Sequence, residues 1–95
     1  MSEVTDRIPA PEQRSLAEQL RRAALSVSTN IAEGAGREGK RESKYFFNVA
    51  KGSVYEVVSL LEVTRRRGYV SSEVHGALYE RCDQIARMLS GLLRK

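Results

Sequence analysis

Hydrophobic residues recur at steps of three and four along three stretches of the chain, and no stretch alternates with the period of two that a β-strand requires. We predict an all-α fold, an antiparallel up-down bundle with helices over about 11–33, 41–67 and 72–94. Residues 1–10 lack this periodicity and are expected to form a flexible leader or a helix stub ahead of the bundle domain, residues 11–95. The positions that share the main face of each helix are Leu16, Leu20, Ala24, Val27 and Ile31, then Phe46, Val49, Ser53, Val57, Leu60 and Thr64, and finally Val74, Leu78, Cys82, Ile85, Leu89 and Leu92.

The second helix has a wider apolar face than the others, which is typical of a helix that is buried on more than one side. The residues that widen it are Phe47, Ala50, Val54, Leu61 and Val63. Gly52 lies in its middle at a cost of about 1 kcal/mol relative to alanine, and such a glycine indicates a close approach between helices. Gly34 and Gly36 are predicted to end the first helix and Gly68 the second, because glycine accepts the left-handed conformation that follows a helix. Ser71 or Ser72 is expected to cap the third helix.

The length of 95 residues fits one domain. Cys82 is the single cysteine, so an internal disulfide is impossible. No run approaches the roughly 18 apolar residues of a membrane span, and the N-terminal residues lack the apolar core of a signal peptide. These features favour a cytoplasmic protein.

Few residues of the chain are suited to catalysis. His75 and Cys82 are seven positions apart on one predicted helix, about 10 Å along its axis, which is too far for a nucleophile and its base. Cys82 also falls on the apolar face, as a small buried hydrophobic residue would. Glu73 and His75 do not have the Glu-x-x-His spacing of di-metal bundles. We therefore expect no enzyme, no cofactor, no metal site and no small-molecule substrate.

Basic residues outnumber acidic ones, giving a net charge of +4 and a pI of about 9.6, which suits an acidic partner. They concentrate toward the two ends of the second predicted helix. Two interpretations stay open: a solvated face, or contacts to nucleic acid. The candidate nucleic-acid contacts are Arg37, Lys40, Arg41, Lys44 and Lys51 in the first cluster and Arg65, Arg66 and Arg67 in the second.

A ribbon of polar residues runs beside the apolar face of the first helix. Arg22, Ser26, Asn30 and Glu33 follow one another at steps of four, four and three, and Glu56 flanks the core face of the second helix. The ribbon is either a solvated face or a polar network between helices or subunits. We predict that Asn30 and Glu33 matter for structure more than for ligand binding.

The run QLRRAALSVSTNIAEGAGREGKRESKYFFNVAKGSVYEV, followed by LLEVTRRRGYV, resembles the four-helix bundle protein family. Its members include proteins encoded within intervening sequences of bacterial large-subunit (23S) ribosomal RNA genes. The strongest elements are residues 21–23 and 30–34, and the resemblance extends from about Pro9 to the C-terminus. The positions that carry the structural motif of the family are Arg22, Asn30, Glu33, Gly34 and Glu56.

The resemblance implies a non-enzymatic bundle that assembles into a homo-oligomeric ring, typically a pentamer. The bundle is also similar, more distantly, to the accessory protein of diversity-generating retroelements, a basic pentameric ring that works with a reverse transcriptase and RNA. RNA or a ribonucleoprotein is therefore an expected partner.

Family members usually carry another long helix before the position of Pro9, whereas eight residues precede it here. We accordingly expect three long helices with most of the first family helix missing. The groove left by that helix suggests an alternative function, a protein-interaction adaptor that accepts a partner helix.

Overall fold

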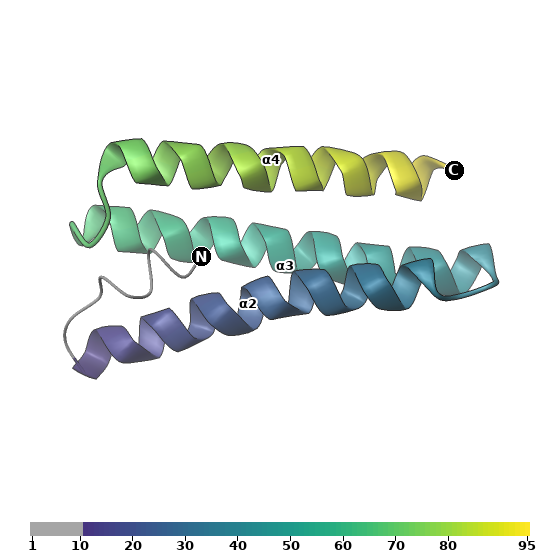
Figure 1. Ribbon diagram of the computed structural model, residues 1–95, viewed down its shortest axis with the longest axis horizontal. Helices are drawn as coiled ribbons and strands as arrows, with labels where there is room; N and C mark the ends of the chain where they lie inside the picture. The colour runs from purple at the N-terminus through teal and green to yellow at the C-terminus, as the bar shows by residue number, and fades with distance from the viewer. Residues whose placement is uncertain (1–10) are drawn as a thin grey trace.

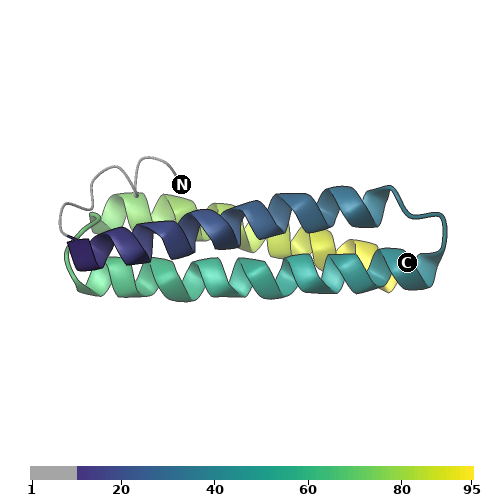
Figure 2. The same ribbon diagram turned by 90° about the horizontal axis from the view of Figure 1, so that it is seen from below.

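The computed structural model describes residues 11–95, which form three helices and no strand (Figure 1). These are α2 (Pro11–Ala35), α3 (Lys40–Arg66) and α4 (Ser72–Arg94). Successive helices run antiparallel, as the two views in Figures 1 and 2 show. The all-α up-down fold is therefore confirmed. The predicted leader or helix stub lies outside the described residues.

Helix α3 is the centre of the bundle. Both α2 and α4 pack along it, whereas no Cα atom of α2 lies within 8 Å of one in α4. Figure 1 shows α3 between α2 and α4. Because α3 has a neighbour on each of two sides, its buried arc is wide, as the sequence pattern indicated.

The core is a continuous strip of side chains from all three helices. Leu20, Val54, Leu61 and Leu89 are almost completely buried in it. Thr64 is buried as well, and its hydroxyl donates a hydrogen bond of 2.7 Å to the backbone carbonyl oxygen of Leu60, which satisfies this polar group. Burying a side chain of leucine size stabilises the fold by roughly 1.5–3 kcal/mol.

The buried face of α3 differs from the predicted main face. Three residues of the predicted main face are buried, Ser53, Val57 and Thr64. The residues predicted to widen it are buried as well, except Val63, which is exposed like Val49. The width of this face was predicted correctly, whereas its centre was not. In the structure two neighbours flank α3, and the buried arc is centred between them.

Of the two glycines predicted to end the first helix, Gly34 lies inside α2, which continues to Ala35, and Gly36 directly follows the helix. Gly34 is buried, and a Cβ built on it would lie 2.6 Å from Cε1 of Phe47. The glycine therefore allows α2 and α3 to approach closely. The N–H of Gly36 then bonds the carbonyl oxygens of Ala32 and Glu33 at 3.1 and 3.2 Å and closes the last turn.

The connection from α3 to α4 follows the predicted capping chemistry. Gly68 has a φ of 76°, its N–H bonds the carbonyl of Arg65, and the N–H of Tyr69 bonds the carbonyl of Thr64. This pair of bonds is a Schellman motif. Ser71, and not Ser72, caps α4, since its hydroxyl accepts a 3.1 Å hydrogen bond from the N–H of Val74.

The close helix approach indicated by Gly52 is not made within the described chain. A Cβ added at this glycine would meet no atom within 4 Å. Gly52 lies instead on the exposed side of α3.

Candidate nucleic-acid interface

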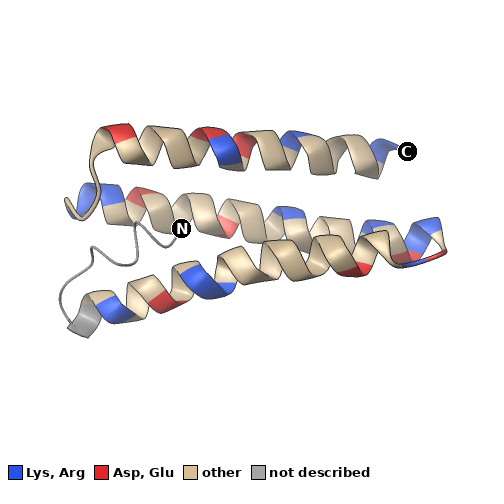
Figure 3. Cartoon of the chain, viewed as in Figure 1, with Lys and Arg blue, Asp and Glu red and all other residues tan. Residues whose placement is uncertain are grey.

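The first basic cluster gathers where α2 connects to α3, the right-hand end of the molecule in Figure 3. Arg37, Lys40 and Arg41 are exposed there, and Lys44 follows one turn further along α3. Lys40 Nζ donates a 3.2 Å hydrogen bond to the backbone oxygen of Lys95. The structure therefore adds the basic end of α4 to this cluster, which the separation of 55 residues hid from the sequence analysis.

Arg37 is held on both sides of its guanidinium group. It donates a 2.8 Å hydrogen bond to the carboxylate of Glu33, and its Cζ lies 4.9 Å from the ring centroid of Phe46. This cation–π contact and the exposed ion pair each contribute at most about 1 kcal/mol. They fix the side chain in place, and Glu33 offsets part of its charge.

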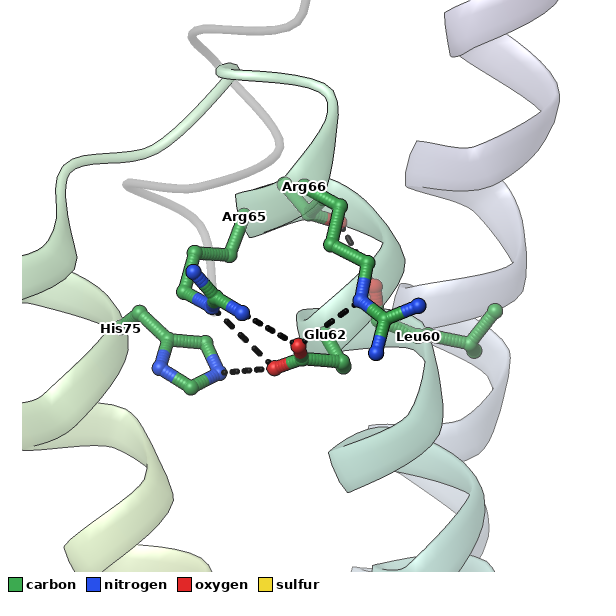
Figure 4. A network of polar contacts seen from close by, with 6 residues as sticks. Leu60, Glu62, Arg65, Arg66 and His75 are labelled. Atoms are coloured by element: carbon green, nitrogen blue, oxygen red, sulfur yellow. Dashed lines mark hydrogen bonds and ion pairs between the residues drawn. The ribbon is translucent and has the colours of Figure 1, made fainter.

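The second basic cluster lies at the other end of α3 and is largely paired (Figure 4). Glu62 accepts hydrogen bonds of 2.5 and 3.2 Å from Arg65 and of 3.0 Å from Arg66. The bond from Arg65, followed by the bond from Arg66, lowers the pKa of Glu62 to about 2. The same partner raises the pKa of Arg65.

Glu62 also connects α3 to α4, because His75 Nε2 lies 3.4 Å from its Oε2 (Figure 4). One carboxylate thus faces two arginines and a histidine. Arg65 and Arg66 are turned toward this carboxylate, so a phosphate would have to compete with it. Arg67 is exposed beside them.

The two clusters consequently differ in what they offer an anion. The prediction treated them alike. Among residues 11–95, Lys40, Arg41 and Lys44 of the first cluster make no ion pair with Asp or Glu, whereas in the second cluster Arg65 and Arg66 are paired and Arg67 is not. Lys51 lies on α3 between the clusters and is half-buried.

The structure supports one interpretation for the centre of the polar ribbon and the other for Arg22 and Glu56. Its centre joins α2 to α3: the hydroxyls of Ser26 and Ser53 are 2.7 Å apart, and Asn30 Nδ2 donates to the backbone carbonyl and hydroxyl oxygens of Ser26 at 2.8 and 3.1 Å. Arg22 and Glu56, in contrast, are exposed.

The residues weighed for catalysis do not come together. Cys82 is buried, and desolvation raises the pKa of its thiol, whereas His75 faces Glu62. Among the described residues no three His, Cys, Asp or Glu side chains form a group suited to a metal ion. None of the helices α2–α4 combines the length and the apolar character needed to cross a membrane.

A shallow groove separates α2 from α4 above the middle of α3. It encloses about 250 Å³, and it is mainly apolar with one charged side chain, Arg81, at its edge. A groove left by a missing family helix was predicted; the groove seen here lies between two helices that are present, so that origin stays a prediction. Its lining residues are Ala24, Val27, Ser28, Val54, Val57, Leu78, Arg81, Cys82 and Ile85.

The described residues therefore define a small antiparallel helical bundle with basic surfaces at the ends of its central helix. A model of the 23S rRNA-intervening sequence protein family matches residues 1–91. The chain belongs to this family, which confirms the resemblance drawn from its sequence. A comparison with curated proteins finds no match.

Proposed function

We propose that this protein is a non-enzymatic bundle subunit that assembles with copies of itself, as a pentameric ring by resemblance to the family. In this proposal it acts in the cytoplasm and binds RNA or a ribonucleoprotein through the first basic cluster. The observation that carries the proposal is a second, exposed stripe along α3, on the side opposite its core face.

The exposed stripe has the spacing of a helix–helix interface. Its positions follow steps of four and three, the repeat that keeps one seam facing a partner helix. Gly52 and Ser59 alternate with larger residues, which supports close approach of a second helix. Large apolar side chains exposed in a row support association. The stripe consists of Tyr45, Val49, Gly52, Glu56, Ser59 and Val63.

Two exposed charges, one of them within the stripe, support the same assembly. Arg22 on α2 and Glu56 on α3 are exposed, and neither makes an ion pair within residues 11–95. In a head-to-tail ring, each subunit could present one of these charges to its neighbour. Such pairs set orientation more than affinity.

The assembly can be tested by sizing with light scattering. The unchanged protein is expected to run as a homo-oligomer, and the double substitution V49D/V63D should shift it toward a monomer. Leu25→Asp is the matched control, because Leu25 is exposed on α2 away from the stripe. A monomer at high concentration of the unchanged protein would rule the assembly out.

The proposed RNA binding rests on Lys40, Arg41 and Lys44, which make no ion pair with Asp or Glu within residues 11–95. Titration of structured RNA at two salt concentrations should give weaker binding at the higher one, since each phosphate contact releases a counterion. A triple change of these residues to glutamine should lower both affinity and salt dependence. Absence of RNA binding at low salt would contradict the proposed RNA binding and would leave the assembly proposal unaffected.

A second candidate function is supported by the groove between α2 and α4. In this alternative the chain is an adaptor that takes one amphipathic helix of a protein partner, with apolar residues over Leu78 and Ile85 and a carboxylate opposite Arg81. Helix-in-groove recognition uses such anchors. A stoichiometric protein that co-purifies with the unchanged chain and with L25D, but not with I85E, would favour the adaptor.

A further inference from the structure

A second hollow lies along the contact of α3 with α4, on the other side of Cys82 from the groove described above. Its walls are two tyrosines, Tyr55 of α3 and Tyr79 of α4, and its floor is apolar. It encloses about 90 Å³. The full lining is Val54, Tyr55, Val58, Tyr79, Cys82, Asp83 and Ala86. We call this hollow the tyrosine slot.

Both tyrosine rings are presented to solvent. Tyr55 is 55% exposed and Tyr79 is 50% exposed, a large area for aromatic side chains in the middle of their helices. The ring of Tyr79 is stacked against His75, with centroids 6.3 Å apart and planes at 29°. His75 in turn contacts Glu62 of α3, so Tyr79 is held against a positioned neighbour. The exposed faces of the two rings are flat and apolar, and contacts within the fold leave them uncovered.

Lysines continue the same side of α3 from the tyrosine slot. Lys44 and Lys51 precede Tyr55 by eleven and four positions, and such spacings place side chains on one side of a helix. Lys40 lies one turn before Lys44 and contacts the backbone of Lys95 on α4. From Lys40 to Tyr55 the row is about 22 Å long.

The acidic residue of the slot is already paired. Asp83 Oδ2 lies 3.0 Å from Nε of Arg87, the next turn of α4. The positive charge of Arg87 offsets the negative charge of Asp83, which would otherwise repel a phosphate. The surface thus joins a row of three lysines to two exposed aromatic rings, with one neutralised carboxylate.

We infer that this surface binds an unpaired strand of RNA, with phosphates along Lys44 and Lys51 and a base in the tyrosine slot against Tyr55 and Tyr79. The inference rests on the proposed RNA binding and specifies its ligand. Bases stack on aromatic rings only where they are unpaired, because a duplex hides their faces. Stacking of this kind is tolerant of sequence. The strand is therefore recognised as single-stranded and not as a particular sequence.

Tyrosine fluorescence reports the contact directly, because the chain has four tyrosines and no tryptophan. We would titrate an unstructured single-stranded RNA, and separately its fully paired duplex, into the unchanged protein at low salt. The single strand should bind more tightly than the duplex and should quench the fluorescence. Quenching should be smaller in Y55L and Y79L.

Matched substitutions separate the ring from its hydroxyl. Tyr55→Leu and Tyr79→Leu should each weaken binding of the single strand about tenfold, the loss typical of one stacked base. Tyr55→Phe and Tyr79→Phe keep the ring and should bind as the unchanged protein does. Lys51→Gln should lower the salt slope by about 0.7, the value for one phosphate contact to a single strand. Circular dichroism checks that each variant is folded.

The outcomes distinguish this inference from the function it builds on. RNA binding in which Y55L and Y79L match the unchanged protein, or in which the duplex binds equally well, overturns the tyrosine slot and leaves RNA binding in place. If a leucine variant does not fold, two measurements on the unchanged protein still test the tyrosine slot: the affinity for single-stranded RNA relative to its duplex, and the quenching of tyrosine fluorescence. Absence of any RNA binding at low salt overturns both.

Discussion

The ring of Phe47 on α3 occupies the space that a side chain at Gly34 of α2 would need. An ideal Cβ at Gly34 would lie 2.6 Å from Cε1 and 2.7 Å from Cδ1 of this ring, closer than real Cβ contacts. Phe47 is itself buried, so it has little room to move. The glycine is therefore a packing requirement of the α2–α3 contact, although glycine within a helix costs about 1 kcal/mol relative to alanine.

Replacing Gly34 by alanine should destabilise the protein by about 1–2 kcal/mol, because the overpacking cost exceeds the gain in helix propensity. Gly76→Ala is the matched control on α4, since nothing lies within 4 Å of a Cβ there. It should stabilise by up to about 1 kcal/mol. Urea unfolding measures both. Adding Phe47→Leu should recover part of the loss in G34A, and equal effects of G34A and G76A would contradict the clash.

Leu61 is the completely buried leucine of α3, the helix that both other helices contact. Leu61→Ala should destabilise by about 2–5 kcal/mol, the range for leucine truncation in a core. Leu25→Ala removes the same atoms from a side chain that is 65% exposed, and its effect should stay within about 0.5 kcal/mol. Similar losses for the two variants in urea unfolding would show that the core lies elsewhere.

Acid should weaken the fold through Glu62. Its pKa falls from 4.5 to about 2 on folding because Arg65, and then Arg66, hydrogen-bond its carboxylate. A lowered pKa means that the contribution of this group is present above pH 4.5 and is lost as the pH falls toward 2. Glu62→Gln should flatten the stability profile across this window while Glu42→Gln does not. If the pH dependence of the melting temperature is the same in E62Q as in the unchanged protein, the Glu62 carboxylate is not its cause.

Asn30 and Glu33 are predicted to act on stability and not on RNA affinity. Asn30→Ala removes two hydrogen bonds to Ser26, and Glu33→Gln removes the ion pair with Arg37. Together the changes should lower stability by about 1 kcal/mol, or roughly 4–8 °C in Tm for a domain of this size. An unchanged melting temperature, or a loss confined to RNA affinity, would count against the structural role.

Cys82 should react slowly with thiol reagents at neutral pH. The side chain is 6% exposed, and burial raises the pKa of its thiol, so little of the reactive thiolate form is available. Urea concentrations that unfold the protein should raise the rate of alkylation sharply. Rapid reaction of the native protein would show that the α3–α4 contact opens readily.

The three helices and their antiparallel order could be predicted from the chain, because helix formation depends on residues three and four positions apart. Capping at Gly68 and Ser71 is equally local, since the bonds span four to six residues. The absence of a nucleophile–base pair between His75 and Cys82 was also predictable, as both lie on one helix. Each of these properties is set by neighbours along the sequence.

Tertiary structure alone decided where the buried face of α3 is centred, why Gly34 must be glycine, and which arginines are paired. The burial of Phe47 in place of Val49 follows from having a helix on each of two sides, which no single periodicity can encode. The pairing of Tyr55 with Tyr79 in one slot likewise joins residues 24 positions apart. The physical reason is common to all of them: packing and electrostatics act through space, and α2, α3 and α4 meet only when the chain has folded.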